Sequence, residues 1–183
     1  MIHERGYWLD RHLTALHQCD IPLCDAVVST FKDVKTIIDV GCGNGGYTKH
    51  LIDNGFECVG YDGSPLTPEI SDGLCGVMDF SQPVEVGEFD LVLCLEVGEH
   101  VPAHYEQVFI DNLVTAAKQF IVISWATIGQ CGSGHVNCQD NQYVIDEFFK
   151  RGFAYKEDKT QFLRDNATFW WFENTTMVFE KII

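Results

Sequence analysis

The chain has 183 residues, of which 46% are hydrophobic and 21% charged, enough apolar material for one core and too little for a second. Acidic residues outnumber basic ones, 27 to 12, so the formal net charge is −15. Such a charge repels polyanions and excludes nucleic acid as an expected partner. The chain has no CxxC pair among its eight cysteines, no leader-like start and no long apolar run. We therefore expect a single-domain cytoplasmic protein over residues 1–183 without a membrane partner.

The predicted elements alternate between strands and helices. Apolar spacing predicts one or two helices between residues 9 and 31, which would form a helical cap (1–33) on a core (34–183). Strands are expected at residues 35–40, 56–61, 73–78, 89–95, 119–125 and 175–183, and helices at 45–54, 102–118 and 141–152. Pro102 suits a first helical position, and Gly152 a helix stop.

This alternation predicts an α/β fold with a mostly parallel sheet, helices on both faces, and ligands beyond the carboxyl ends of the strands. The C-terminal segment FWWFENTTMVFEKII contains two β-rich runs with no helical pattern between them. It predicts an antiparallel addition to the sheet edge.

A glycine-rich loop follows the first predicted strand. Gly41, Gly43 and Gly46 satisfy the pattern GxGxxG, and Asp62 follows at the distance where an acid would hold a ribose hydroxyl. This loop alone is compatible with an NAD-dependent oxidoreductase. Asp39 favours another ligand, because a carboxylate beside the loop repels a pyrophosphate but suits an ammonium and a sulfonium.

Four segments in order resemble the motifs of the class I S-adenosylmethionine (SAM) dependent methyltransferases. The segment IIDVGCGNGG resembles the first motif, CVGYDGS the second, GVMDFS the third, and FDLVLCLEVGEHVP the fourth strand with its loop. The motifs span residues 36–102, and the resemblance covers nearly the whole chain at the level of the fold. It implies a Rossmann-like methyltransferase fold with a mostly parallel seven-stranded sheet and one antiparallel C-terminal strand.

The resemblance also implies a SAM site. Asp62 would hold the ribose hydroxyls, and Asp79 would accept from the adenine amino group. Met78 and Phe80 would flank the adenine ring. The complete set of predicted SAM-binding residues is Asp39, Gly41, Cys42, Gly43, Asp62, Gly63, Met78, Asp79, Phe80, Leu95 and Glu96. Structural alternatives compete with each role: turns at the glycines and at Asp62, an Asx-type loop at Asp79, and core packing for the apolar pair.

The segment EVGEHVP places Glu96 at the end of the fourth predicted strand, with Glu99 and His100 in the following loop. His100 is a candidate general base, since the reference pKa of histidine lies near neutrality. The two carboxylates and the imidazole also suit a divalent cation such as Mg²⁺. A loop cap or a plain pocket wall is the structural alternative.

The ExxEH pattern with a later histidine, here His135, is similar to metal-dependent ubiquinone-biosynthesis O-methyltransferases and to plant-type small-RNA 2′-O-methyltransferases. The net charge argues against the RNA relatives. This similarity makes His100, Glu99 and His135 the catalytic candidates. The metal-ligand candidates are Glu96, Glu99, His100 and His135.

A polar, glycine-rich loop, GQCGSGHVN, follows the fifth predicted strand. His135 and Asn137 are candidate substrate contacts there, although Asn137 also suits a helix cap. Trp125 is either a pocket wall or core, and Tyr7 is a candidate contact for the methionine end of SAM.

We expect a SAM-dependent methyltransferase that acts on a small-molecule acceptor, most consistently at oxygen. A non-catalytic SAM-binding accessory subunit and an NAD-dependent oxidoreductase are the alternatives.

Overall fold

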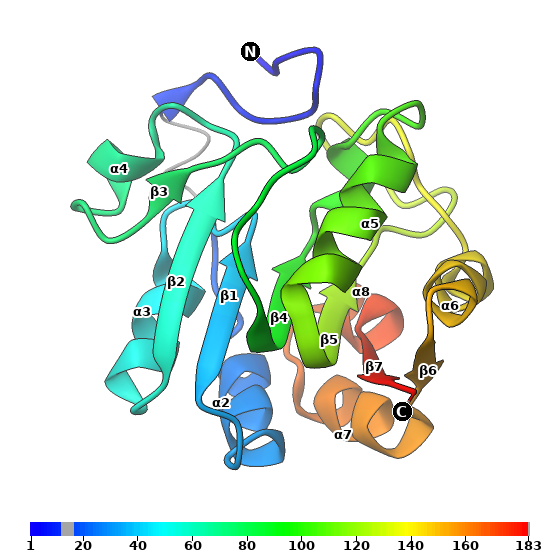
Figure 1. Ribbon diagram of the computed structural model, residues 1–183. Helices are drawn as coiled ribbons and strands as arrows, with labels where there is room; N and C mark the ends of the chain where they lie inside the picture. Colours follow the sequence, from blue (N-terminus) through cyan, green and yellow to red (C-terminus); the bar gives the residue numbers. More distant parts are fainter. Residues whose placement is uncertain (12–16, 183) are drawn as a thin grey trace.

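The computed structural model describes residues 1–11 and 17–182 and is built around a seven-stranded sheet (Figure 1). The strand order is β3-β2-β1-β4-β5-β7-β6. The strands are β1 (Thr36–Val40), β2 (Glu57–Asp62), β3 (Gly76–Val77), β4 (Phe89–Leu95), β5 (Ala117–Ser124), β6 (Phe153–Tyr155) and β7 (Met177–Lys181). β7 pairs antiparallel with β5 and β6, and the other pairs are parallel. The expected mostly parallel sheet with one antiparallel C-terminal strand is confirmed.

Helices cover both faces of the sheet and bury two separate cores. One face carries α5 (Glu106–Ala116) and α6 (Asn141–Lys150), whose Phe109 and Phe148 pack with the strands. The other face carries α2 (Ile21–Thr30), α3 (Gly46–Asp53), α7 (Glu157–Asn166) and α8 (Trp170–Thr175). The short helix α4 (Thr67–Ile70) lies beside β3 at the sheet edge (Figure 1).

Several predicted boundaries shift. Helix α5 begins at Glu106, so Pro102 lies before the helix rather than at its first position. Strand β3 keeps only two of its six predicted residues. Residues 12–16 of the predicted N-terminal helical region lie outside the described residues, and α2 accounts for its later part.

The prediction of a strand at the aromatic run FWWF was wrong, because this run forms the start of α8. The rings of Phe169 and Phe172 stack three residues apart, which is helical spacing, with centroids 6.1 Å apart. The start of α8 is held by Asp20, whose Oδ2 accepts from the backbone N–H groups of Thr168 (2.6 Å) and Phe169 (2.8 Å). Strand β6 and helix α7, which were not predicted, complete this region.

The carboxyl ends of the parallel strands meet at one edge of the sheet, and the N-terminal segment crosses above this edge (Figure 1). Helix α2 lies elsewhere, packed against α7. Within the described ranges, every helix is too short or too polar to traverse a lipid bilayer.

Candidate cofactor and acceptor site

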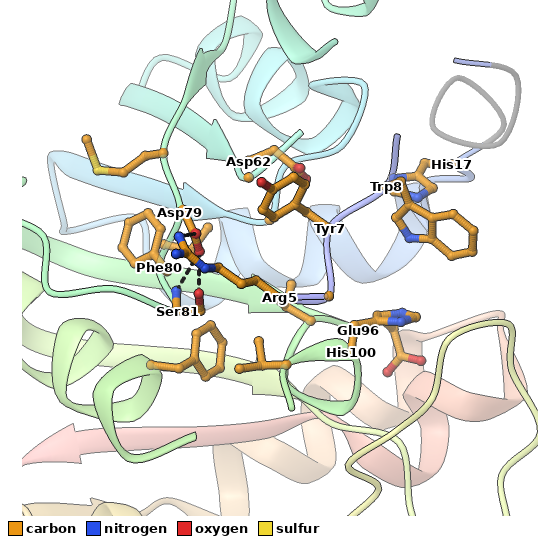
Figure 2. A pocket seen from close by; sticks show the side chains of 18 residues that line it. Arg5, Tyr7, Trp8, His17, Asp62, Asp79, Phe80, Ser81, Glu96 and His100 are labelled. Carbon is orange, nitrogen blue, oxygen red and sulfur yellow. Dashed lines mark hydrogen bonds and ion pairs between the residues drawn. The ribbon is translucent and has the colours of Figure 1, made fainter. Parts of the chain in front are cut away.

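A first cavity, of about 90 Å³, opens beyond the carboxyl ends of the strands (Figure 2). Its lining includes these predicted site residues: Gly41, Asp62, Gly63, Met78, Asp79, Phe80, Glu96 and His100. The side chain of Arg5 extends across the cavity toward Asp79, while Tyr7 lies beside Asp62 (Figure 2). The cavity is small for a pocket that binds an organic cofactor, roughly 300–1,000 Å³.

A second cavity, of about 380 Å³, adjoins the first. The two share Trp8, His17, Gly41, Glu96 and His100 in their linings. The remaining predicted residues in its lining are Asp39, Cys42, Leu95 and His135. Every predicted SAM-binding residue except Gly43 therefore lines one of the two cavities.

The side chain of Asp62 is hydrogen-bonded to the backbone of the glycine loop and to the backbone just after β2. The carboxylate of Asp62 accepts from the N–H of Gly43 (3.0 Å) and from that of Ser64 (2.8 Å). Gly41 has a φ of +77°, and a Cβ built there would lie 2.2 Å from Cγ2 of Val97. Any larger residue at position 41 would thus be strained and would clash.

Asp39 is buried beneath this loop. Its Oδ2 accepts a hydrogen bond from the Thr48 hydroxyl (2.6 Å). Burial raises the pKa of Asp39 to about 7, partly opposed by the Thr48 hydrogen bond. The carboxyl group is therefore poised between its neutral and charged forms near neutral pH, at the wall of the second cavity.

Both oxygens of Asp79 have partners. Oδ1 accepts from the hydroxyl (2.6 Å) and the N–H (3.0 Å) of Ser81, as an Asx-type loop requires. Oδ2 accepts from Nη1 of Arg5 (2.9 Å). Arg5 therefore competes for the carboxylate that was predicted to accept from the adenine amino group.

Replacing Arg5 with alanine is expected to strengthen SAM binding up to about fivefold, because it frees Asp79 and enlarges the first cavity. The ion pair is partly exposed to solvent, so breaking it costs little free energy. Calorimetric titration would measure the change, with Arg11→Ala as the control, since Arg11 pairs with Glu69 instead (3.2 Å). Weaker binding of SAM to Arg5→Ala would instead make Arg5 part of the cofactor site.

Glu96 directly follows β4. Its φ of +55° lies in the left-handed region, which is strained for a residue other than glycine. The hydroxyl of Ser124 accepts from the N–H of Glu96 (2.8 Å) and donates to its Oε1 (2.8 Å). Gln130 donates to the other carboxylate oxygen (3.3 Å). These bonds fix the Glu96 side chain at the junction of the two cavities.

Three of the four predicted metal ligands, Glu99, His100 and His135, come together with ligand atoms within 4.8 Å of one another, and Glu96 is not part of this cluster. Glu99 is fully buried, and its carboxylate oxygens make no hydrogen bond of normal geometry among the described residues. Burial and the neighbouring charge of Glu96 raise the pKa of Glu99 well above its usual value. This environment disfavours the ionised form of Glu99.

The structure weakens the case for His100 as a general base. Burial, and next the nearby His135, lower the pKa of His100 to about 4. Its imidazole is neutral at pH 7, which is the metal-binding form, but it is a weak proton acceptor. Its Nδ1 lies 3.1 Å from the carbonyl oxygen of Gly134.

The loop that carries His135 is tied to Glu99. The N–H groups of Val136 and Asn137 both donate to the Glu99 carbonyl (2.9 Å each). Nδ2 of Asn137 donates to the buried Glu106 (2.8 Å), so Asn137 is neither a substrate contact nor the α6 cap, which is Asp140. Trp125 is fully buried and donates to the Asn137 carbonyl (2.7 Å), which makes it core rather than pocket wall.

Other residues reach the cavities from parts of the sequence that carry no local signal. These are Arg5, Trp8, His17, Trp171 and Phe172. Tyr7, the candidate contact for the methionine end of SAM, packs over Gly63 in the first cavity. Their positions depend on how the chain termini fold back, which spacing along the chain does not reveal.

The fold and the paired cavities at the strand ends agree with a match to known proteins. Residues 15–121, more than half of the chain, match the family model described as a methyltransferase domain. The chain belongs to this methyltransferase domain family.

Among curated proteins, the chain is similar to the chloroplastic tocopherol O-methyltransferase of Arabidopsis thaliana. The two are 33% identical over 110 residues, which cover 51% of this chain and 31% of that protein. Norajmaline N-methyltransferase of Rauvolfia serpentina is 28% identical over 111 residues, which cover 52% of this chain and 37% of that protein. The matched part of the chain spans about a third of the length of these relatives.

Solved structures share the whole fold. The TehB-like SAM-dependent methyltransferase of Corynebacterium glutamicum has a TM-score of 0.66 at 16% identity and covers 94% of each chain. The sugar N-methyltransferase KedS8 of Streptoalloteichus has a TM-score of 0.68 at 13% identity, covering 88% of this chain and 85% of its own. The Rossmann-like methyltransferase fold expected from the motifs is confirmed.

Proposed function

We propose that this chain transfers the methyl group of SAM to a small-molecule acceptor. The observation that carries this proposal is the pair of adjoining cavities that meet at Glu96 and His100. Asp62 and Asp79 line the first, where the adenosine would bind, and Asp39 lines the second, where a carboxylate suits the ammonium of SAM. Catalysis would be mainly positioning, because the sulfonium of SAM is already a good leaving group.

We propose oxygen as the acceptor atom, in accord with the similarity to tocopherol O-methyltransferase. The hydroxyl oxygen would attack the methyl carbon, the carbon–sulfur bond would break as the carbon–oxygen bond forms, and the sulfonium would become a thioether. The hydroxyl proton would leave to solvent water. The N-methyltransferases among the relatives make nitrogen the competing acceptor.

The cluster of Glu99, His100 and His135 fits a divalent cation, since a buried carboxylate to which no described residue gives a hydrogen bond of normal geometry lies beside two imidazoles. The two imidazoles favour a first-row transition metal over Mg²⁺. Glu96 would sit beside the ion, held by Ser124 and Gln130. When bound, the cation would lower the pKa of the acceptor hydroxyl.

Two alternatives keep the same cofactor loop. A non-catalytic SAM-binding subunit would need the residues of the first cavity but not the cluster of Glu99, His100 and His135. An NAD-dependent oxidoreductase would place a pyrophosphate near Asp39, which the buried carboxyl group disfavours.

Asp62→Ala is expected to weaken SAM binding at least tenfold, because it removes the carboxylate predicted to bind the ribose hydroxyls. Calorimetric titration of SAM would measure the loss, with NADH as the comparison ligand. Asp53→Ala is the matched control, since Asp53 pairs on the surface with Lys49 (2.6 Å). Binding of NADH in preference to SAM, or unchanged SAM binding by Asp62→Ala, would refute the proposed cofactor site.

A further inference from the structure

The second cavity has aromatic walls from widely separated parts of the chain. Trp8 comes from the N-terminal segment, Tyr47 from α3, and Trp171 and Phe172 from α8. The cavity, of about 380 Å³, would hold the ammonium end of SAM beside Asp39 and the acceptor between the aromatic walls. Aromatic walls that face a common space favour a flat ring between them.

The polar end of this cavity holds the histidines. The ring of Trp8 meets that of His100 edge-on, with centroids 5.9 Å apart, and His100 meets His135 at 5.1 Å. Trp8 and His17 lie together, on the side of the first cavity away from Asp79 (Figure 2). The aromatic walls thus lead directly to the junction where the first cavity begins.

The charge of the lining selects against anions. Glu96 lines the second cavity, Asp39 would face the ammonium of SAM, and none of the described lining residues is Lys or Arg. The other polar residues include the uncharged Gln18, Asn44 and Ser133. An anionic ligand would lose its hydration here without gaining a counter-ion.

We propose that the aromatic part of the second cavity, beyond the place of the SAM ammonium beside Asp39, is the acceptor site, that it binds a flat aromatic ring bearing a hydroxyl group, neutral or positively charged, and that Trp171 is a specificity-determining wall. This inference rests on the proposed function, since it places the acceptor hydroxyl at the junction where the methyl group would be delivered. It narrows the acceptor to phenol-like compounds and excludes aromatic acids.

Four probes of nearly equal size test the proposal: para-ethylphenol, its cationic analogue tyramine, its anionic analogue para-hydroxyphenylacetate, and para-ethylcyclohexanol, which lacks the flat ring. Each would be titrated calorimetrically into protein saturated with S-adenosylhomocysteine. We expect para-ethylphenol and tyramine to bind at least tenfold more tightly than the other two.

Trp170 and Trp171 form a matched pair of variants. Trp170 is next in the same helix, is 57% exposed and does not line the cavity. Trp171→Ala is expected to weaken para-ethylphenol binding about tenfold, Trp170→Ala to leave it unchanged, and Trp171→Phe to retain most of it. Retained binding by Trp171→Phe separates a wall function from damage to the fold.

Equal or tighter binding of the carboxylate or the saturated ring would overturn the proposal. Equal losses in Trp170→Ala and Trp171→Ala would also overturn it, as would the failure of all four probes in protein that binds S-adenosylhomocysteine. Failure of S-adenosylhomocysteine itself to bind would instead refute the proposed function.

Discussion

Asp39→Asn is expected to stabilise the cofactor-free protein at pH 8 by about 3 kcal/mol more than at pH 5. Burial raises the pKa of Asp39 to about 7, so the native state holds this carboxyl group protonated at a pH where the unfolded chain ionises it. When the pKa of a group differs by one between the folded and unfolded states, the free energy of unfolding changes by about 1.4 kcal/mol. Asparagine keeps the acceptor for the Thr48 hydroxyl and never ionises.

The sign follows from proton binding. Between about pH 4 and pH 7 the native state binds more protons at Asp39 than the unfolded state does, so the stability of the wild type falls as pH rises through this window. Above pH 7 the loss is complete. Denaturant unfolding of wild type and variant at the two pH values would measure it, with the free energy of unfolding compared at each.

Asp90→Asn is the matched control with the opposite sign. The carboxylate of Asp90 accepts from the N–H groups of Lys35 (2.9 Å) and Thr36 (3.1 Å), which lowers its pKa. The ionised Asp90 carboxylate stabilises the native state above the usual pKa of an aspartate, and this contribution is lost at lower pH. Asp90→Asn should therefore be less stable than the wild type at pH 8. Equal pH profiles for Asp39→Asn and the wild type would contradict the assignment to Asp39.

The buried Asp39 lowers the stability of the cofactor-free protein, so its presence is not explained by folding alone. A cation at the wall of the second cavity would relieve it, because the ionised form of Asp39 would then have a partner. The ammonium group of SAM has the required charge. Strain of this kind is expected at a binding site rather than in a structural core.

The cofactor half of the site was predictable from the sequence because its residues are local to strand ends. Asp39, Asp62, Asp79 and Glu96 each lie at or near the end of a strand, and parallel strands bring their carboxyl ends to one edge. The cluster of Glu99 and His100 follows for the same reason. His135 joins it because the loop after β5 emerges beside the loop after β4.

The aromatic walls of the second cavity were not predictable, since they depend on contacts between distant segments. Trp171 reaches the second cavity because Asp20 anchors the start of α8 from far along the chain. The aromatic run favours a strand by propensity, and tertiary packing overrides that preference. Arg5 reaches Asp79 across 74 positions, which no spacing pattern indicates.

Glu99→Gln is expected to lower methyl transfer about 100-fold while raising the stability of the protein at neutral pH. Glutamine has the shape of glutamate, but it is a weaker ligand for a divalent cation and removes the charge that burial disfavours. The opposite directions of the two effects exclude misfolding as the cause of lost activity. Titration of Mn²⁺ into chelator-treated protein should show binding to the wild type and little or none to the variant.

Glu147→Gln is the control for a buried glutamate outside the cluster. Glu147 pairs with Lys150 (2.6 Å) and Arg151 (2.8 Å) on α6, and these cations lower its pKa. Its replacement should reduce stability slightly and leave activity and Mn²⁺ binding intact. If chelator-treated wild type kept full activity, or Glu99→Gln bound Mn²⁺ as the wild type does, the buried carboxylate would not be a metal ligand. Glu99 would then act only through its backbone carbonyl, which holds the loop of His135 in place.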